Sequence, residues 1–123
     1  MAPILLVLLA LPGTQGSDVA LRGPALDLFL KSRGRSHLNR DVHWHVPAKA
    51  LATPLRVRRG WRLHRHRGIG ILVPEGSAAL GEIRRRGGVA CIRGRVIKVP
   101  AAKRAKGDPA YAVVVRQLSR RKK

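Results

Sequence analysis

Hydrophobic and polar residues follow different patterns in three parts of the chain. Residues 4–11 are an unbroken apolar run that Pro12 and Gly13 end. Residues 17–68 are polar and basic with little sustained periodicity, whereas residues 69–118 contain several apolar stretches rich in β-branched side chains. Such stretches, bounded by Gly and Pro, are typical of strands. The pattern therefore predicts that ordered structure concentrates in the C-terminal half.

Three stretches of the C-terminal half are predicted to be strands. They are Ile69–Val73, Val89–Val99 and Tyr111–Val115. Gly94 interrupts the second stretch at a place where a β-bulge is expected. A basic loop containing Gly-Asp-Pro separates the last two stretches, so we expect them to pair as antiparallel neighbours.

Two short helices are predicted. Residues 24–32 begin with a proline, which suits a first helical turn, and place Leu26, Phe29 and Leu30 on one face. The second helix is expected after Ser77, which can cap it. It should extend through about residue 86, where a glycine follows.

The middle of the chain gives weaker signals. Residues 33–60 contain two prolines and are predicted to be loop, with one short strand at Val42–Val46. Residues 55–67 alternate in two stretches, which indicates a basic strand or ribbon. The predicted fold class is therefore α+β, small and only partly ordered. It combines short helices and an irregular basic middle with a β-rich unit over about residues 69–118 and a basic tail over 119–123.

Charge narrows the class of partner. Lys and Arg supply 26 of the 123 residues against six Asp and Glu, for a net charge of +20. A chain so one-sided repels itself unless a polyanion neutralises it. Most of the cations are Arg, whose planar guanidinium can bind phosphate or sulfate with two hydrogen bonds.

Clusters of cations around a tryptophan, on the second predicted helix and in the C-terminal loop and tail are the candidate binding residues. Cations beside an aromatic ring can neutralise phosphates and stack on bases. We therefore predict a non-catalytic protein that binds RNA or other nucleic acid electrostatically. The predicted residues are Arg56, Arg58, Arg59, Trp61, Arg62, Arg65, Arg67, Arg84, Arg85, Arg86, Lys103, Arg104, Lys106, Arg120, Arg121, Lys122 and Lys123.

The amino terminus leaves the localisation open. Residues 1–16 match a secretory signal peptide, with an apolar run, a breaker and small residues before a cleavage point after Gly16, although Lys and Arg are absent before the run. If residues 1–16 are cleaved, the protein is expected to be a secreted cationic peptide or precursor that acts on anionic membranes or heparin-like sugars. Residues 56–59 would then resemble a site for proteolytic processing. Otherwise a nuclear or nucleolar protein is expected. A third alternative is a young, minimally selected reading frame without a stable fold.

Enzymatic, metal and cofactor chemistry receive little support from the sequence. The six acidic residues are scattered, so no pair is placed for acid and base catalysis. Two histidine pairs, His43 with His45 and His64 with His66, have a spacing that could present two imidazoles to a metal. Cys91 is remote in sequence and arginines surround the second pair, so these are interpreted as polar loop histidines. No catalytic residue, metal site, cofactor or small-molecule substrate is predicted.

One local resemblance favours RNA as the partner. Residues 106–116, Lys-Gly-Asp-Pro-Ala-Tyr-Ala-Val-Val-Val-Arg, together with the basic tail resemble a strand-and-loop segment of the L-fourteen family of large-subunit ribosomal proteins. The resemblance implies a small β-barrel that binds ribosomal RNA. It is confined to this segment, and the Asp-Asn-Ser/Thr-Gly turn of that family is absent upstream. The chain is therefore not identified as a member.

Overall fold

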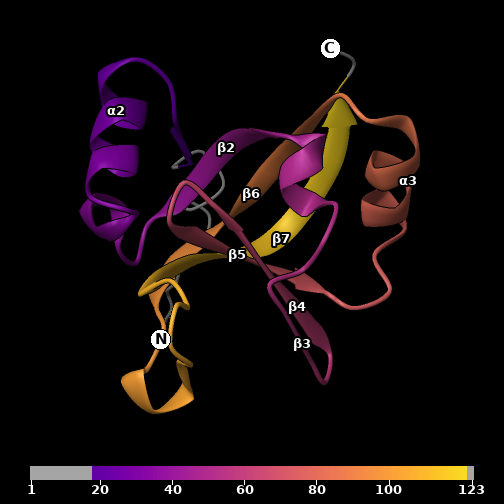
Figure 1. Ribbon diagram of the computed structural model, residues 1–123. Helices are drawn as coiled ribbons and strands as arrows, with labels where there is room; N and C mark the ends of the chain where they lie inside the picture. Colours follow the sequence, from indigo (N-terminus) through magenta and orange to yellow (C-terminus); the bar gives the residue numbers. More distant parts are fainter. Residues whose placement is uncertain (1–17, 122–123) are drawn as a thin grey trace, which may run out of the picture.

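The computed structural model describes residues 18–121, which form a seven-stranded mixed sheet with two short helices (Figure 1). The strands are β1 (Val19–Ala20), β2 (Asp41–Pro47), β3 (Arg56–Arg58), β4 (Trp61–His66), β5 (Ile69–Pro74), β6 (Val89–Lys98) and β7 (Tyr111–Arg121). The helices are α2 (Pro24–Lys31) and α3 (Ala78–Arg86). The 3-10 turns that lie between other elements are η2 (Arg35–His37), η3 (Ala48–Leu51) and η4 (Ala101–Lys103). The predicted signal peptide, Lys122 and Lys123 lie outside the described residues. None of the helices described is long and apolar enough to cross a bilayer.

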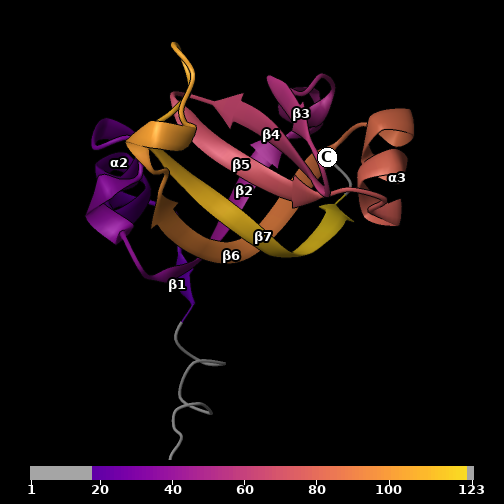
Figure 2. The ribbon, with the colours of Figure 1, turned by 90° about the horizontal axis from the view of Figure 1, so that it is seen from below.

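The sheet has the strand order β1-β2-β6-β7-β5-β4-β3. The β1–β2 and β5–β7 pairs are parallel, and the other neighbours are antiparallel. Helices α2 and α3 lie at opposite ends of the sheet (Figures 1 and 2). The β6–β7 pair is antiparallel, and its register shifts between Arg93 and Gly94, which confirms the predicted pairing and bulge.

The predicted fold class, a small and only partly ordered α+β fold with an irregular basic middle, is wrong. Of the described residues, strands make up 44%, and helices together with the 3-10 turns make up 25%, so the fold is ordered and β-rich. The basic middle is part of the sheet, because it supplies β2, β3 and β4. Charge and prolines suggested loop there, but the prolines at 47 and 54 lie at the end of β2 and between η3 and β3, where they interrupt no ladder.

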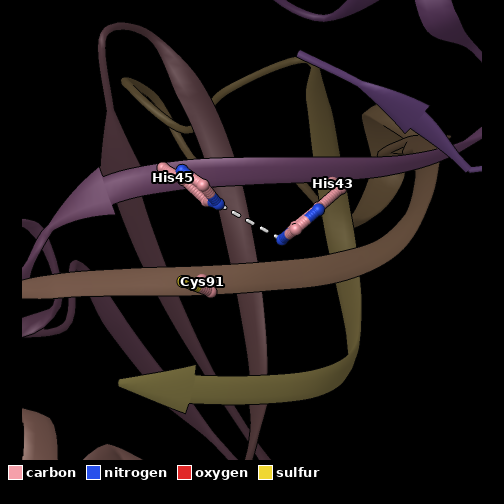
Figure 3. A group of neighbouring side chains, drawn as sticks. All are labelled: His43, His45 and Cys91. Carbon is pink, nitrogen blue, oxygen red and sulfur yellow. Dashed lines mark hydrogen bonds between the residues drawn. The ribbon is translucent and has the colours of Figure 1, made fainter. Parts of the chain in front are cut away.

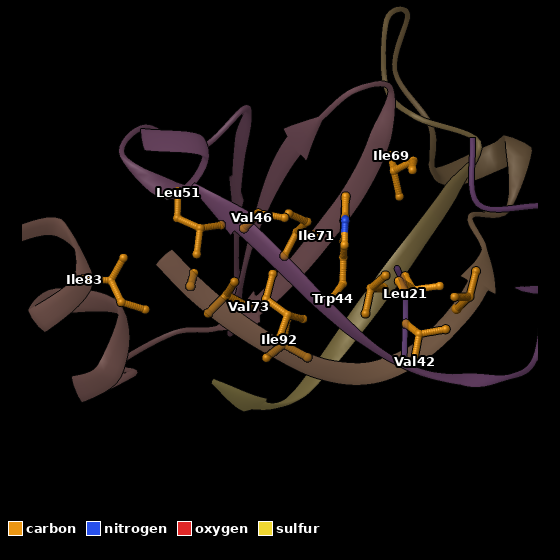
Figure 4. Packing of buried hydrophobic residues seen from close by; sticks show 14 of the residues in the cluster. Leu21, Val42, Trp44, Val46, Leu51, Ile69, Ile71, Val73, Ile83 and Ile92 are labelled. Atoms are coloured by element: carbon orange, nitrogen blue, oxygen red, sulfur yellow. The ribbon is translucent and has the colours of Figure 1, made fainter. Parts of the chain in front are cut away.

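Strand β2 forms because its alternate side chains meet the hydrophobic core. Val42, Trp44 and Val46 are buried on one face of the sheet, with Trp44 packed edge-on against Phe29 of α2 at a ring distance of 5.1 Å (Figure 4). His43 and His45 point to the other face. We call the face with Trp44 the core face and the opposite face the outer face.

Helix α3 has the ends that the sequence predicts. The Ser77 hydroxyl accepts a hydrogen bond from the Leu80 amide at 3.2 Å, and Gly87, with φ 71°, follows the last turn. Leu80 and Ile83 are buried in the core cluster. The helix therefore covers the core at the end of the sheet opposite α2.

A second, smaller apolar contact lies on the outer face. A Cβ atom at Gly70 would lie 2.8 Å from both the Ala112 Cβ and the Pro109 Cγ, and 3.2 Å from a Leu63 methyl. Such distances require glycine at this position. The loop of residues 99–110, between β6 and β7, is therefore packed against the outer face beside β4 and β5.

Burial of His64 on β4 predicts a pH-dependent stability. Its side chain is 0% exposed, and burial, followed by the charge of Arg84, lowers its pKa from 6.5 to about 4. Between these values the unfolded chain binds a proton that the folded protein does not, so the free energy of unfolding falls as pH decreases from about 6.5 to about 4. The 2.5-unit difference corresponds to a loss of up to about 3 kcal/mol. Urea unfolding at several pH values measures it.

The variant His64→Leu tests the assignment. Leucine fills a similar volume without a titrating group, so the variant should lose the part of the decline that His64 causes, up to about 3 kcal/mol. The smaller part due to His37, His43 and His66, whose pKa values burial also lowers, should remain. His45→Gln, a substitution at an exposed histidine, is the control; with EDTA present in all samples, so that no metal contributes, it should retain the decline. A decline of equal size in His64→Leu would show that other groups cause it.

Candidate nucleic-acid interface

The β3–β4 hairpin and loop 99–110 are held together by arginines. The Arg56 Nε lies 2.8 Å from the Asp108 Oδ1, and Arg65 donates a hydrogen bond from Nη1 to the Gly107 carbonyl at 2.7 Å. Asp108 also accepts a bond from the Ala105 amide at 3.0 Å. Two cations of the hairpin therefore fix the loop over the outer face.

A groove of about 380 Å³ lies between this loop and the outer face, which we call the Trp61 groove. Its floor is apolar, with side chains of β4 to β7 such as Leu63 and Leu72, and Trp61 lies on its wall. Arg58 is the cross-strand partner of Trp61, and Arg58 and Arg59 both line the groove. Since Trp61 is 38% exposed, part of its ring is accessible to a partner.

A second hollow, of about 410 Å³, adjoins loop 99–110 and is lined by four arginines. They are Arg33, Arg35, Arg65 and Arg104, and we call this site the arginine hollow. The chain reverses after α2, where Arg33 has φ 56°, and the Cδ of Arg33 lies 3.3 Å from the Cβ position of Gly68 in the β4–β5 turn. Segments far apart in sequence thus contribute arginines to one hollow.

Asp108 lines both the Trp61 groove and the arginine hollow, but its negative charge is already paired with Arg56. The hydrogen bond from the Ala105 amide and then Arg56 hold the pKa of Asp108 below its usual value, although burial acts in the opposite direction. The carboxylate is therefore ionised and paired with Arg56. Because Arg56 already neutralises this carboxylate, the four arginines of the hollow retain a net excess of positive charge.

The structure brings some of the predicted binding residues together. Arg58, Arg59 and Trp61 line the groove, and Arg65 and Arg104 line the hollow, whereas Arg56 is bound to Asp108. Lys106 is exposed in the intervening loop, which also contains Lys103. The predicted residues that line the groove and those that line the hollow therefore lie on the two sides of loop 99–110.

Other predicted residues lie elsewhere, and four of them have structural partners. Arg84 Nε donates to the Leu51 carbonyl at 3.1 Å, and Arg120 Nε donates to the Gly87 carbonyl at 2.8 Å. Arg85 and Arg86 pair with Glu82 on α3. The remaining ones are Arg62, half-buried on the opposite side of β4 from Trp61, Arg67 in the β4–β5 turn, and Arg121 at the end of β7.

Sequence reasoning missed Arg33 and Arg35. They follow α2 in a segment predicted to be loop, where Lys31 is the neighbouring cation and no aromatic residue is adjacent. Their importance comes from their proximity to Arg65 and Arg104, some 30 and 70 residues further along the chain. No local pattern in the sequence signals that proximity.

Comparison with known proteins assigns no relative. The chain matches no protein-family model and no curated protein.

Proposed function

We propose that the protein is a non-catalytic binder of single-stranded nucleic acid, with RNA as the favoured partner. The observation that carries the proposal is the position of the arginine hollow and the Trp61 groove on either side of one loop. Guanidinium groups bind phosphates, and an accessible tryptophan beside an apolar floor can stack on an unpaired base. A single-stranded nucleic acid presents both phosphates and unpaired bases, at short and regular intervals.

The acidic residues of the described part of the chain are consistent with this role. Asp18, Asp41, Glu82 and Asp108 each form an ion pair with arginine. Pairing neutralises these four acids locally, and the 26 Lys and Arg residues outnumber all six acids, so a large excess of positive charge is present for a polyanion to match. The apolar groove favours nucleic acid over a sulfated sugar or an anionic membrane surface, because neither of these has the planar rings that stack on tryptophan.

We expect the variant Trp61→Ala to weaken binding of a short single-stranded RNA. Loss of one stacked base costs about 1–3 kcal/mol, which corresponds to a roughly 5- to 150-fold higher Kd. Fluorescence anisotropy with a labelled oligonucleotide measures the change. Binding of heparin, which has sulfates but no bases, should change little in the same variant.

Val57→Ala is the matched control. Val57 is 62% exposed on the same hairpin, and it lies on the opposite face of the sheet from Trp61 because the two residues alternate along paired strands. This control should bind RNA as the wild-type protein does. If Trp61→Ala also retains the wild-type affinity, the groove is not part of the RNA site.

A further inference from the structure

Strand pairing brings two histidines and the single cysteine together on the outer face. His43 and His45 are two residues apart on β2, so their side chains project from the same side. The β2–β6 register places Cys91 directly opposite His45. Figure 3 shows the two imidazoles pointing toward one another above β6, where Cys91 lies.

The distances between these side chains are close to those of a metal site. The two Nε2 atoms are 3.2 Å apart, and the candidate ligand atoms of the three residues all lie within 4.8 Å of one another. Two imidazoles that bind zinc tetrahedrally, with Zn–N bonds of about 2.0–2.1 Å, have nitrogens about 3.3 Å apart. A Zn–S bond of about 2.3 Å requires a sulfur–nitrogen distance of about 3.6 Å, which a small side-chain rotation can supply.

The surroundings can accept a dication. A hollow of about 290 Å³ beside the cluster is lined by His43, Cys91, Arg93, Gln117 and Ser119, so solvent can reach a fourth coordination position. The Arg93 guanidinium is the nearby cation that would repel a metal ion, and Asp18 pairs with it at 3.6 Å. Binding also converts the thiol to a thiolate, which adds one negative charge to the site.

We propose that His43, His45 and Cys91 bind a divalent ion of the zinc class, with the fourth position open to solvent. Imidazole and thiolate donors select zinc over magnesium and calcium, which prefer oxygen ligands. The site shares no lining residue with the Trp61 groove or the arginine hollow. Its test is therefore independent of RNA binding.

Titration of the untagged, reduced full-length protein with Co²⁺ tests the proposal by absorption spectroscopy. We expect one ion per chain, a thiolate-to-cobalt charge-transfer band, the visible bands of four-coordinate cobalt, and displacement by one equivalent of Zn²⁺. Cys91→Ser should abolish the charge-transfer band. Both Cys91→Ser and His45→Ala should weaken binding by more than the roughly 10- to 100-fold that loss of an outer-shell partner costs.

His66→Gln is the matched control, because His64 and His66 have the same spacing on β4 but belong to no such cluster among the described residues. It should bind Co²⁺ as the wild-type protein does. His45 is exposed, so its replacement should leave the fold intact. The His45→Ala variant therefore tests the proposal even if Cys91→Ser disturbs folding. Wild-type binding without a charge-transfer band overturns the proposal, as does equal affinity in His45→Ala or an equal loss in His66→Gln.

Discussion

Replacing Arg33, Arg35, Arg65 and Arg104 together with Gln should weaken binding of a short single-stranded RNA by about 100- to 1000-fold at low salt. Each arginine that contacts a phosphate releases counterions, so each contributes about 0.7 to the slope of log K against log salt. Loss of four contacts should therefore reduce the magnitude of that slope by about three. Anisotropy titrations over a series of salt concentrations measure both quantities.

A second quadruple variant distinguishes a defined site from diffuse attraction by net charge. Arg22, Arg40, Arg85 and Arg121 are all exposed and line neither the groove nor the hollow. Their replacement by Gln removes the same charge but should cost much less affinity and change the slope by less than about one. If the two variants lose affinity equally, RNA binds the whole cationic surface and the arginine hollow has no special role.

The largest effect on stability is expected for Gly94→Ala. Gly94 is buried where the β6–β7 register shifts, opposite an extra residue of β7, and a Cβ atom there would overlap the Val114 carbonyl oxygen of β7 and lie 2.8 Å from its carbon. The obstacle is backbone in the middle of the sheet, so no side-chain rotation relieves it. We expect a loss of at least about 3 kcal/mol, a large part of the 5–15 kcal/mol that typically stabilises a domain.

Gly81→Ala on α3 is the control for this substitution. A Cβ atom at Gly81 meets nothing within 4 Å, and alanine is the better helix former. This variant should be more stable than the wild-type protein by roughly 0.5–1 kcal/mol. Urea unfolding of the two variants measures the contrast, and a Gly94→Ala protein as stable as the wild type would contradict the described β6–β7 register.

Local features of the sequence predict the individual elements well. The proline at the start of α2, the Ser77 cap of α3 and the β-branched stretches of β5 to β7 are all read from neighbouring residues. The Gly94 bulge is another such feature. These signals succeed because capping, turn formation and strand preference depend mainly on short-range interactions.

The arrangement of the elements depends on contacts that no local pattern encodes. The parallel β5–β7 pair and the β2–β6 register are fixed by which apolar faces share the core. The β2–β6 register places Cys91 opposite His45, although they were not grouped as metal ligands from the sequence because they are far apart along the chain. The Arg56–Asp108 pair likewise closes the groove across 52 residues. The middle of the chain was predicted to be largely irregular, although strands were expected at Val42–Val46 and within residues 55–67, where β2, β3 and β4 lie. No local pattern showed that these segments join one sheet.

The most direct measurement of the proposed interface is the fluorescence of Trp61 during titration with nucleic acid. Trp44 is buried in the core, so the difference between the wild-type protein and a Trp61→Phe variant isolates the Trp61 emission. Stacking on a base should quench this emission in proportion to occupancy by oligouridine, and inorganic polyphosphate should bind without quenching it. Equal responses to the two polymers, or RNA binding that leaves Trp61 emission unchanged, would contradict a site built from the groove and the arginine hollow together.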